Sequence, residues 1–598
     1  MFTSRRVDFR PLRLLPIAVA LVLLSRSVLA DEQAAAIERR LHDSVALLAA
    51  DDMEGRGPGT AGIDKAADYI AAQFRQIGLR TDLYDGGPFQ KFSVSTLVRP
   101  GDGARLVLAG PQQGGPALRL ELKPSEGFNA TALSGSATFD LPLMFVGYGI
   151  TAPKEKYDDY AGVEVRGKAV VVLRHEPQQA DPKSVFNGTN DSEYAPFARK
   201  IQNAIEHGAA AVIFVTDEFD VQRRIAQARK RWTEALDKIG QQNEAFKKIE
   251  KPSVDQVEAQ RKQIETLVRQ ANACSEQLRG EYDPLLPFEV GGRETVSAKF
   301  PVLACRRSVV EKAIRAATGT DLADLERRID EGLKPQSREL TGWRAEGSVS
   351  VLRTEQQVRN VIAVCEGSGP LAGEAIVVGA HYDHIGVRTQ AGNKIVMNGA
   401  DDNASGTAAL LEIARTVQAR KAEAKDKPRR RVIFIAFSAE ELGLLGSTHY
   451  VKNPLAPLES TVAMVNLDMV GRLRDDNLTL SGVETSPRFP SLVDALAPKY
   501  QFQLAKTPAK FGPSDQLPFY ARAVPVLHFF TGLHADYHGP GDDAEKINVA
   551  GMRRISLMAA DVVNTLAEEE KRPGFALDIL GLGALGNLLS RKSPPAKK

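Results

Sequence analysis

Three short apolar runs in the second half of the chain are rich in β-branched residues, and each is followed by acidic or imidazole groups. They cover residues 374–380, 432–439 and 462–467. Continuous apolar runs of this length are typical of strands buried on both faces of a parallel sheet. The carboxyl ends of such strands meet at one edge of the sheet, where ligands bind. The sequence therefore predicts an α/β fold with a mostly parallel central sheet flanked by helices and a polar site at its edge.

The polar residues after these runs have the spacing that metal chemistry needs. His381 and Asp383 lie two apart, so an extended backbone projects both side chains to the same side. One can bind a metal ion while the other accepts the remaining ring N–H of the histidine. Glu440 and Glu441 are adjacent, so on a strand they point in opposite directions, and one can bind metal while the other moves protons. Asp468 directly follows the third run.

Two further candidates complete the set. Asp402 lies between a glycine turn and a helix expected over residues 407–419, where its carboxylate can bridge two cations. Capping of that helix by Asp401 or Asp402 is the alternative interpretation. His538 lies in the segment 536–543. Two histidines and three carboxylates without cysteine suit zinc, with cobalt or manganese as further options.

These motifs resemble those of zinc metallopeptidase family 28, the co-catalytic two-zinc aminopeptidases. The matching segments are Glu54-Gly55-Arg56, His381-x-Asp383, residues 399–406, Glu440-Glu441, residues 466–469 and Tyr537-His538-x-Pro540-x-Asp542. The resemblance implies that His381 and Asp468 hold one zinc ion, that Glu441 and His538 hold the other, and that Asp402 bridges them. It also implies that Glu440 is the general base and that Asp383 is the partner of His381.

The function implied by the resemblance is removal of N-terminal residues from peptides that have a free amino terminus. A hydroxide held between two zinc ions would attack the peptide bond, with Glu440 as base. Tyr537 is either a hydrogen-bond donor to the developing oxyanion or a packed aromatic beside a ligand. The alternatives are a carboxypeptidase or glutaminyl cyclase of the same fold, and a non-catalytic receptor-like ectodomain.

A chain of 598 residues predicts two or three domains. We expect residues 31–130 and 346–570 to form the peptidase domain, with its metal site in the second part, and residues 571–598 to form a tail. Residues 131–345 are expected to form an inserted β-rich domain, and the segments 145–150, 158–162 and 207–213 resemble a protease-associated domain. Within the insert, apolar residues at helical spacing predict a helical hairpin at about 219–281. It could be a lid, an oligomer contact or a solvated decoration.

The first 30 residues predict a signal peptide. Arginines precede an apolar stretch at residues 14–24, and small residues precede Asp31. We expect export to a periplasm or the exterior, without a stable membrane span after cleavage. An uncleaved anchor is the alternative, although the apolar stretch is shorter than the ~20 residues that span a bilayer.

Charge and cysteine content exclude some classes of protein. A net charge of +2 gives no reason to expect nucleic acid or an anionic membrane as a partner. Three cysteines exclude a disulfide-built scaffold and a cysteine-ligated zinc site, and Cys274 with Cys305 is one conceivable disulfide pair. The sequence leaves the oligomeric state and the preferred N-terminal residue open.

Overall fold

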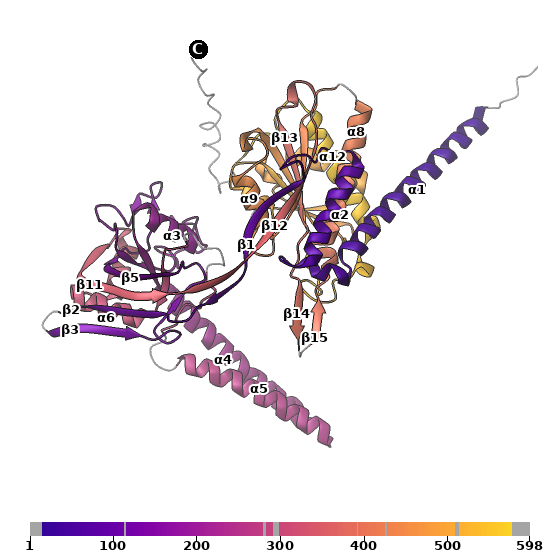
Figure 1. Ribbon diagram of the computed structural model, residues 1–598. Coiled ribbons are helices and arrows are strands. Elements are labelled where there is room, and N and C mark those ends of the chain that lie inside the picture. The colour runs from indigo at the N-terminus through magenta and orange to yellow at the C-terminus, as the bar shows by residue number, and fades with distance from the viewer. Residues whose placement is uncertain are drawn as a thin grey trace, which may run out of the picture. The chain divides into compact units, whose positions relative to one another are not determined.

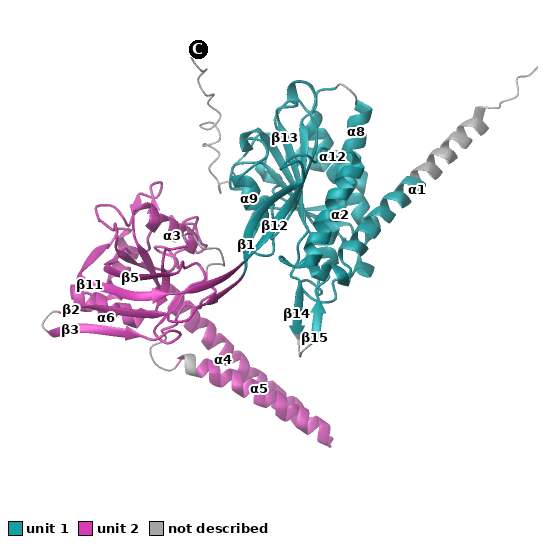
Figure 2. Cartoon of the chain, in the orientation of Figure 1, with its two compact units in different colours: residues 1–96, 355–598 teal, residues 97–354 magenta. Residues whose placement is uncertain are grey.

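The computed structural model in Figure 1 describes residues 15–112, 115–278, 283–290, 298–390, 393–424, 427–508 and 513–576, with residues 15–30 described by backbone only. The chain folds as two compact units (Figure 2). Unit 1 comprises Met1–Thr96 and Glu355–Lys598, and unit 2 comprises Leu97–Thr354. The two boundaries between the units fall within long strands, β1 (Phe89–Pro100) and β12 (Val351–Cys365).

Unit 1 contains an eight-stranded sheet in the order β1-β12-β16-β13-β17-β20-β18-β19. Besides β1 and β12, its strands are β13 (Ala375–His381), β16 (Arg431–Phe437), β17 (Thr461–Leu467), β18 (Asn477–Ser481), β19 (Gln503–Thr507) and β20 (Val526–Phe530). The central neighbours β16, β13, β17 and β20 are parallel, whereas β12–β16 and β18–β20 are antiparallel. The predicted mostly parallel central sheet is therefore confirmed.

Both faces of this sheet are covered by helices, which explains why its central strands are apolar throughout. On β13, Ile376 and Val378 belong to the core that also contains residues of α1 (Leu15–Leu48), α2 (Ala61–Ile77), α8 (Gly406–Ala424) and α12 (Val549–Glu568). Ala375 and Val377 belong to the opposite core, with residues of α9 (Leu445–Lys452) and α11 (Gln516–Tyr520). Because alternate residues face opposite cores, a polar residue within these strands would be buried on either side.

Unit 2 contains a second eight-stranded sheet in the order β3-β2-β11-β5-β8-β9-β10-β4. The strands are β2 (Arg105–Gln112), β3 (Gly115–Leu122), β4 (Phe128–Ala130), β5 (Ala137–Phe145), β8 (Ala169–Leu173), β9 (Ala211–Val215), β10 (Val302–Cys305) and β11 (Arg338–Val349). Helix α3 (Phe197–Glu206) contributes to one core of this unit, and α6 (Arg307–Thr318) and α7 (Leu322–Gly332) contribute to the other. The interpretation of unit 2 as a protease-associated domain stays a prediction.

The boundaries of unit 2 differ from those expected from the sequence. The unit starts at Leu97 rather than at residue 131, and ends at Thr354 rather than at residue 345. The reason is strand pairing across a long sequence separation. Strand β2 pairs with both β3 and β11, so the segment from Leu97 to residue 130 belongs to unit 2.

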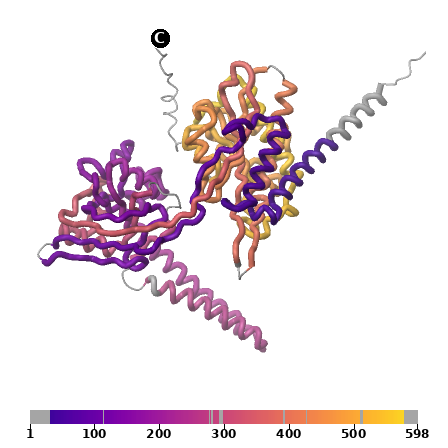
Figure 3. The backbone as a smooth tube through the Cα atoms, viewed as in Figure 1, coloured from indigo at the N-terminus to yellow at the C-terminus, as the bar shows by residue number. Residues whose placement is uncertain are grey.

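The sequence predicts a helical hairpin at about 219–281, and the structure has α4 (Glu218–Lys247) and α5 (Val254–Leu278) there, side by side (Figure 3). Asp217 caps α4 by accepting from the backbone N–H of Asp220. Two helices alone cannot enclose an apolar stripe, and Trp232 and Leu236 accordingly stay 37% and 43% exposed.

Smaller elements and the chain ends complete the description. These elements are β6 (Thr151–Ala152), β7 (Tyr157–Asp158), β14 (Val387–Gln390), β15 (Asn393–Val396) and α10 (Phe489–Leu496). Residues 1–14 of the expected signal peptide and residues 577–598 of the tail lie outside the described residues. Within the described part of the chain, no helix is both long and apolar enough to cross a membrane. Cys274, Cys305 and Cys365 are free thiols, so the conceivable disulfide is not formed.

Candidate metal centre

The predicted metal ligands come together at the carboxyl edge of the unit 1 sheet. His381 is the last residue of β13, and Asp468 follows β17, the neighbouring parallel strand. Glu440 and Glu441 follow β16, which pairs with β13 on its other side. His538 lies in the loop after β20, the next strand along. Parallel pairing of these strands thus brings distant parts of the sequence to one edge.

Asp402 lies between two groups of possible ligands. Its Oδ1 lies 3.4 Å from His381 Nε2, and that nitrogen lies 3.4 Å from Asp468 Oδ1. Its Oδ2 lies 3.1 Å from His538 Nε2, which lies 3.2 Å from Glu441 Oε2. Each oxygen of one carboxylate therefore faces a different histidine, as a bridging ligand would.

His384 is a member of the second group that the sequence reasoning did not single out. Its Nδ1 lies 2.8 Å from Glu441 Oε1 and 3.8 Å from Asp402 Oδ2. The ligand atoms of His384, Asp402, Glu441 and His538 lie within 4.8 Å of one another, and the same holds for His381, Glu440 and Asp468. Its position directly after Asp383 and three residues after His381, the end of a buried strand, was the available signal.

The two glutamates leave the sheet from a turn rather than from a strand. Strand β16 ends at Phe437, two residues earlier than predicted, because Ala439 adopts a positive φ of 59°. Asp383 holds this turn: its Oδ1 accepts from the backbone N–H of Glu440 at 3.1 Å, and its Oδ2 accepts from that of Glu441 at 3.3 Å.

Asp383 contacts His381 differently from the predicted arrangement. His381 Nδ1 is 3.1 Å from the backbone carbonyl oxygen of Asp383, whereas the carboxylate oxygen lies 3.8 Å away. The backbone carbonyl therefore fixes the ring, and the carboxylate fixes the glutamate turn. One residue thus orients ligands of both groups.

The loop that carries Asp402 is held by hydrogen bonds to its neighbours. Asp542 Oδ2 accepts from the backbone N–H groups of Asp401 and Asp402 at 2.9 and 3.0 Å. The backbone N–H of Gly406, where α8 begins, donates to Asn403 Oδ1 at 2.9 Å. Asn403 therefore performs the capping role considered for Asp401 or Asp402, which leaves both oxygens of Asp402 facing the histidines.

A single arginine links the segments behind the site. Arg56 is fully buried and donates to the carbonyl oxygens of Leu48, Tyr382, Asn398 and Gly399 at 2.5–2.8 Å. Burial lowers the pKa of Arg56 to about 10, so the side chain stays charged at neutral pH. The cation thus holds the backbone on both sides of the 383–398 segment without forming a salt bridge among the described residues.

The electrostatics of the site favour positive charge. Burial raises the pKa of Glu440 well above its ordinary value, and Asp468 and Asp515 add to the effect while His381 opposes it. Burial alone would lower the pKa of His381, yet Asp468 and Glu440 raise it well above its ordinary value. In addition, His381 Nε2, His384 Nε2 and Asp468 Oδ1 are buried without a hydrogen-bond partner among the described residues. Burying carboxylates and unpaired ligand atoms is costly, so the site fits divalent cations.

A cavity of about 470 Å³ opens beside these residues and includes His381, Asp402, Glu440, Glu441, Asp468 and His538 in its lining. Tyr537 also lines it, is 41% exposed, and stacks on His538 with ring centroids 3.9 Å apart. The apolar side chains of Met469, Phe530 and Leu533 line the same cavity. There is therefore room for a ligand next to both groups.

The fold and these residues define an α/β protein with two candidate metal sites that share a carboxylate. Residues 360–563 match the model for Peptidase family M28. This part of the chain is therefore similar to that family, in agreement with the resemblance seen in the sequence motifs.

Similar proteins include aminopeptidases. Aminopeptidase YwaD of Bacillus subtilis (strain 168) is 28% identical over 261 residues, which are 40% of this chain and 52% of the relative. An aminopeptidase of Pseudomonas aeruginosa (strain UCBPP-PA14) is 37% identical over 136 residues, 22% of each protein. The chain thus spans about half or less of the length of these relatives.

Two solved structures align with most of the chain. An aminopeptidase from Aneurinibacillus sp. strain AM-1 has a TM-score of 0.44 at 19% identity, with 90% of this chain and 96% of that chain covered. BSAP, a zinc aminopeptidase from Bacillus subtilis, has a TM-score of 0.40 at 20% identity, with coverage of 91% and 98%.

Proposed function

We propose that the protein is an exported, zinc-dependent aminopeptidase that removes N-terminal residues from peptides. The observation that carries this proposal is the placement of Asp402 between two groups of nitrogen and oxygen ligands. One zinc ion would be held by His381, Asp468 and Asp402, and the other by Glu441, His538 and Asp402. The family assignment of residues 360–563 and the aminopeptidase relatives support the reaction.

Two zinc ions would lower the pKa of a bound water to ~7 and polarise the carbonyl of the scissile bond. Glu440 lines the cavity beside His381 and Asp468, and we assign it the role of general base. It accepts the proton of the attacking water and delivers it to the leaving amine. Asp383 positions the glutamate backbone. We assign Tyr537, which lines the cavity, the role of hydrogen-bond donor to the oxyanion that forms on the carbonyl oxygen.

The proposal of export rests on the N-terminal sequence, in which arginines precede an apolar stretch and small residues. It predicts that the mature protein starts near Asp31 and is found in a periplasm or outside the cell. N-terminal sequencing of protein from the extracellular or periplasmic fraction tests this, and an intact Met1 in cytoplasmic protein would contradict it.

Activity and metal content together test the catalytic proposal. We expect two zinc ions per chain, and hydrolysis of aminoacyl chromogenic amides but not of their N-acetylated forms. Glu440→Gln should retain both ions and lose about 10²–10⁴-fold in kcat, the usual contribution of a general base. Glu423→Gln, on the exposed part of α8, is the matched control and should keep full activity.

Other substrates separate the rival enzymes. Turnover restricted to peptides with a free carboxyl terminus would assign a carboxypeptidase, and turnover restricted to N-terminal glutamine peptides would assign a glutaminyl cyclase. A protein that binds no zinc and hydrolyses none of these substrates would fit the receptor-like alternative. Full activity in Glu440→Gln would show that Glu440 is not the general base.

A further inference from the structure

Unit 2 contains a cavity of about 310 Å³ near the start of α4, formed by residues outside the metal centre. Its lining includes three arginines, Arg174, Arg223 and Arg224, together with the apolar side chains of Phe197, Phe219 and Leu286. Ligand pockets range from roughly 300 to 1,000 Å³, so this cavity suits a small group rather than a long segment.

Arg174 is the first sign of a missing partner. Its guanidinium carbon lies 4.2 Å from the centroid of the Phe197 ring and the group donates to the carbonyl oxygen of Ala195 at 3.1 Å. Burial lowers the pKa of Arg174. No carboxylate oxygen of the described residues lies within 4.0 Å of its guanidinium nitrogens. Asp191, Asp217 and Asp220 attract it only from a longer distance. A partly desolvated guanidinium without a carboxylate in direct contact is unfavourable, and an anion in the cavity would compensate it.

The other two arginines share one carboxylate. Asp220 is buried and lies 2.5 Å from Arg223 and 2.7 Å from Arg224, so one negative charge serves two cations. Arg223 also lies over the Phe219 ring at 5.6 Å, which orients it. The only other carboxylate among the described lining residues is Asp191, which is exposed. Three guanidinium groups thus face two carboxylates, of which one is solvated.

Gln179 offers an acceptor to the same cavity. It is only 4% exposed, and its Nε2 donates to the carbonyl oxygen of Thr189 at 3.2 Å. Its Oε1 is buried and has no hydrogen-bond partner in the described part of the chain. A buried acceptor without a donor is unfavourable, and a ligand with an N–H group would satisfy it.

We propose that this cavity binds the C-terminal residue of a peptide. The terminal carboxylate contacts Arg174 and the arginines of α4, because guanidinium groups recognise carboxylates through paired hydrogen bonds. The backbone N–H of that residue donates to Gln179 Oε1, and its side chain packs against Leu286 and Phe219. Phosphate shares the anionic chemistry, but it has no N–H group or apolar part. The proposal stands on unit 2 alone and does not depend on the aminopeptidase activity.

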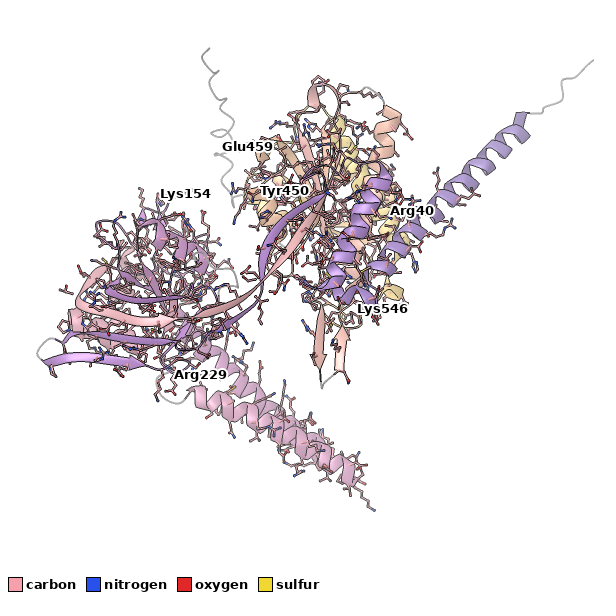
Figure 4. The ribbon with its side chains drawn as sticks, viewed as in Figure 1. Arg40, Lys154, Arg229, Tyr450, Glu459 and Lys546 are labelled. Carbon is pink, nitrogen blue, oxygen red and sulfur yellow. The ribbon has the colours of Figure 1, made fainter. Side chains whose placement is uncertain are left out.

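Calorimetric titration of the full chain with N-acetyl-Ala-Leu tests the proposal, with the C-terminal amide of the same dipeptide as the comparison. The acetyl group prevents attack at a free amino terminus. We expect the free acid to bind at least about tenfold more tightly than the amide, since the amide lacks the charge. Arg174→Gln should weaken binding of the acid by a similar factor. Arg229→Gln, on the exposed face of α4 (Figure 4), should leave it unchanged.

Two checks keep the result specific to this cavity. Binding should persist after zinc is removed with a chelator, which excludes capture of the carboxylate by the metal centre. If circular dichroism shows that Arg174→Gln does not fold, Arg224→Gln provides the same test, because its side chain is 35% exposed and tolerates the change more readily. Equal binding of acid and amide, or no binding of either, would overturn the proposal. Displacement by inorganic phosphate at lower concentrations than the peptide would assign the cavity to phosphate instead.

Discussion

Buried charged groups are arranged differently in the two units. At the sheet edge of unit 1, Asp402, Glu441 and Asp468 gather around histidines, and several buried nitrogen and oxygen atoms have no hydrogen-bond partner in the described segments. In unit 2, buried charges form pairs: His175 Nδ1 lies 2.8 Å from Asp217, and Arg307 lies 2.8 Å from Glu326. Both arrangements survive burial, but the two pairs of unit 2 are each balanced by a partner within the chain. The excess of carboxylates in unit 1 therefore indicates a cation that comes from outside.

The largest test of this contrast exchanges one carboxylate in each unit for an amide. Asp402→Asn should abolish binding of at least one metal ion and lower kcat by about 10³-fold or more, because it removes the carboxylate shared by both sites. Metal emission spectroscopy after dialysis, together with the chromogenic assay, measures both effects. Asp217→Asn should leave the metal content unchanged and lower only the stability of unit 2.

The opposite result would break the comparison. Two tightly bound ions in Asp402→Asn would show that this carboxylate does not join the sites. Loss of metal in Asp217→Asn would show that the paired charges of unit 2 also contribute to the metal centre.

Breaking a buried charge pair of unit 2 should lower the free energy of unfolding. Arg307→Ala leaves Glu326 buried without its cation, and breaking a buried pair in this way costs ~3–5 kcal/mol. Urea unfolding followed by amide protection in α6 and α7 measures the loss. Arg327→Ala is the matched control: its salt bridge to Asp324 is exposed and screened by solvent, so we expect no measurable change in stability. Equal losses in the two variants would mean that burial does not distinguish the pairs.

The strand ends of unit 1 could be predicted because their physics is local. His381 and Asp468 each lie at the end of an apolar run, which is typical of a strand buried on both faces of a sheet. Their position at the end of a strand could therefore be predicted without knowledge of the rest of the chain. Parallel pairing then brings them together. Asp402 was also predictable as a candidate, since small residues surround it, but only the structure shows that Asn403 caps α8 and leaves Asp402 free for other contacts.

What could not be predicted depends on partners that are distant in sequence. The boundary at Leu97 results from pairing between β2 and β11, more than 200 residues apart, and a short strand carries no signal of its distant neighbour. His384 contacts Glu441 only because β13 and β16 are adjacent in the sheet. Arg56 was visible as part of a motif, yet its bonds to four carbonyl oxygens could be seen only in the folded chain.

Arg56 differs from the buried arginine of unit 2 that forms a salt bridge. It is a buried cation at the carboxylate-rich sheet edge of unit 1, and it forms no salt bridge with the described residues. Its bonds to Tyr382 and Gly399 hold the segments that carry His381 and Asp402. We expect Arg56→Met to weaken zinc binding about 10–100-fold, the usual effect of groups that orient metal ligands. Competition with a chromogenic chelator measures the affinity, and Arg75→Met, exposed on α2, should have none of this effect. Partial recovery of zinc affinity in Arg56→Lys would support a role of Arg56 in positioning the metal ligands. If Arg56→Met kept its zinc affinity but unfolded at a lower denaturant concentration, the role of Arg56 would be structural only.

Lys200 is a second cation of unit 2, besides Arg174, that has no carboxylate of the described residues in contact, and it gives the smallest expected effect. It is 1% exposed, and its Nζ donates to the carbonyl oxygens of Leu173 and His175 rather than to a carboxylate. Burial lowers the pKa of Lys200 to about 7, whereas the unfolded chain keeps a lysine pKa of ~10.4. Between these values the unfolded state binds a proton that the folded state has released, so the free energy of unfolding should rise with pH by up to ~1.4 kcal/mol per unit.

Urea unfolding between pH 7.5 and 9.5, followed by amide protection in β8, measures that slope. Lys200→Met should remove it, because both states then bind the same number of protons at this position. Lys154→Met, an exposed lysine of the same unit (Figure 4), should keep the slope of the natural protein. A slope that persists in Lys200→Met would show that another group of unit 2 titrates in this range. The balance of buried charge in that unit would then have to be assigned to different residues.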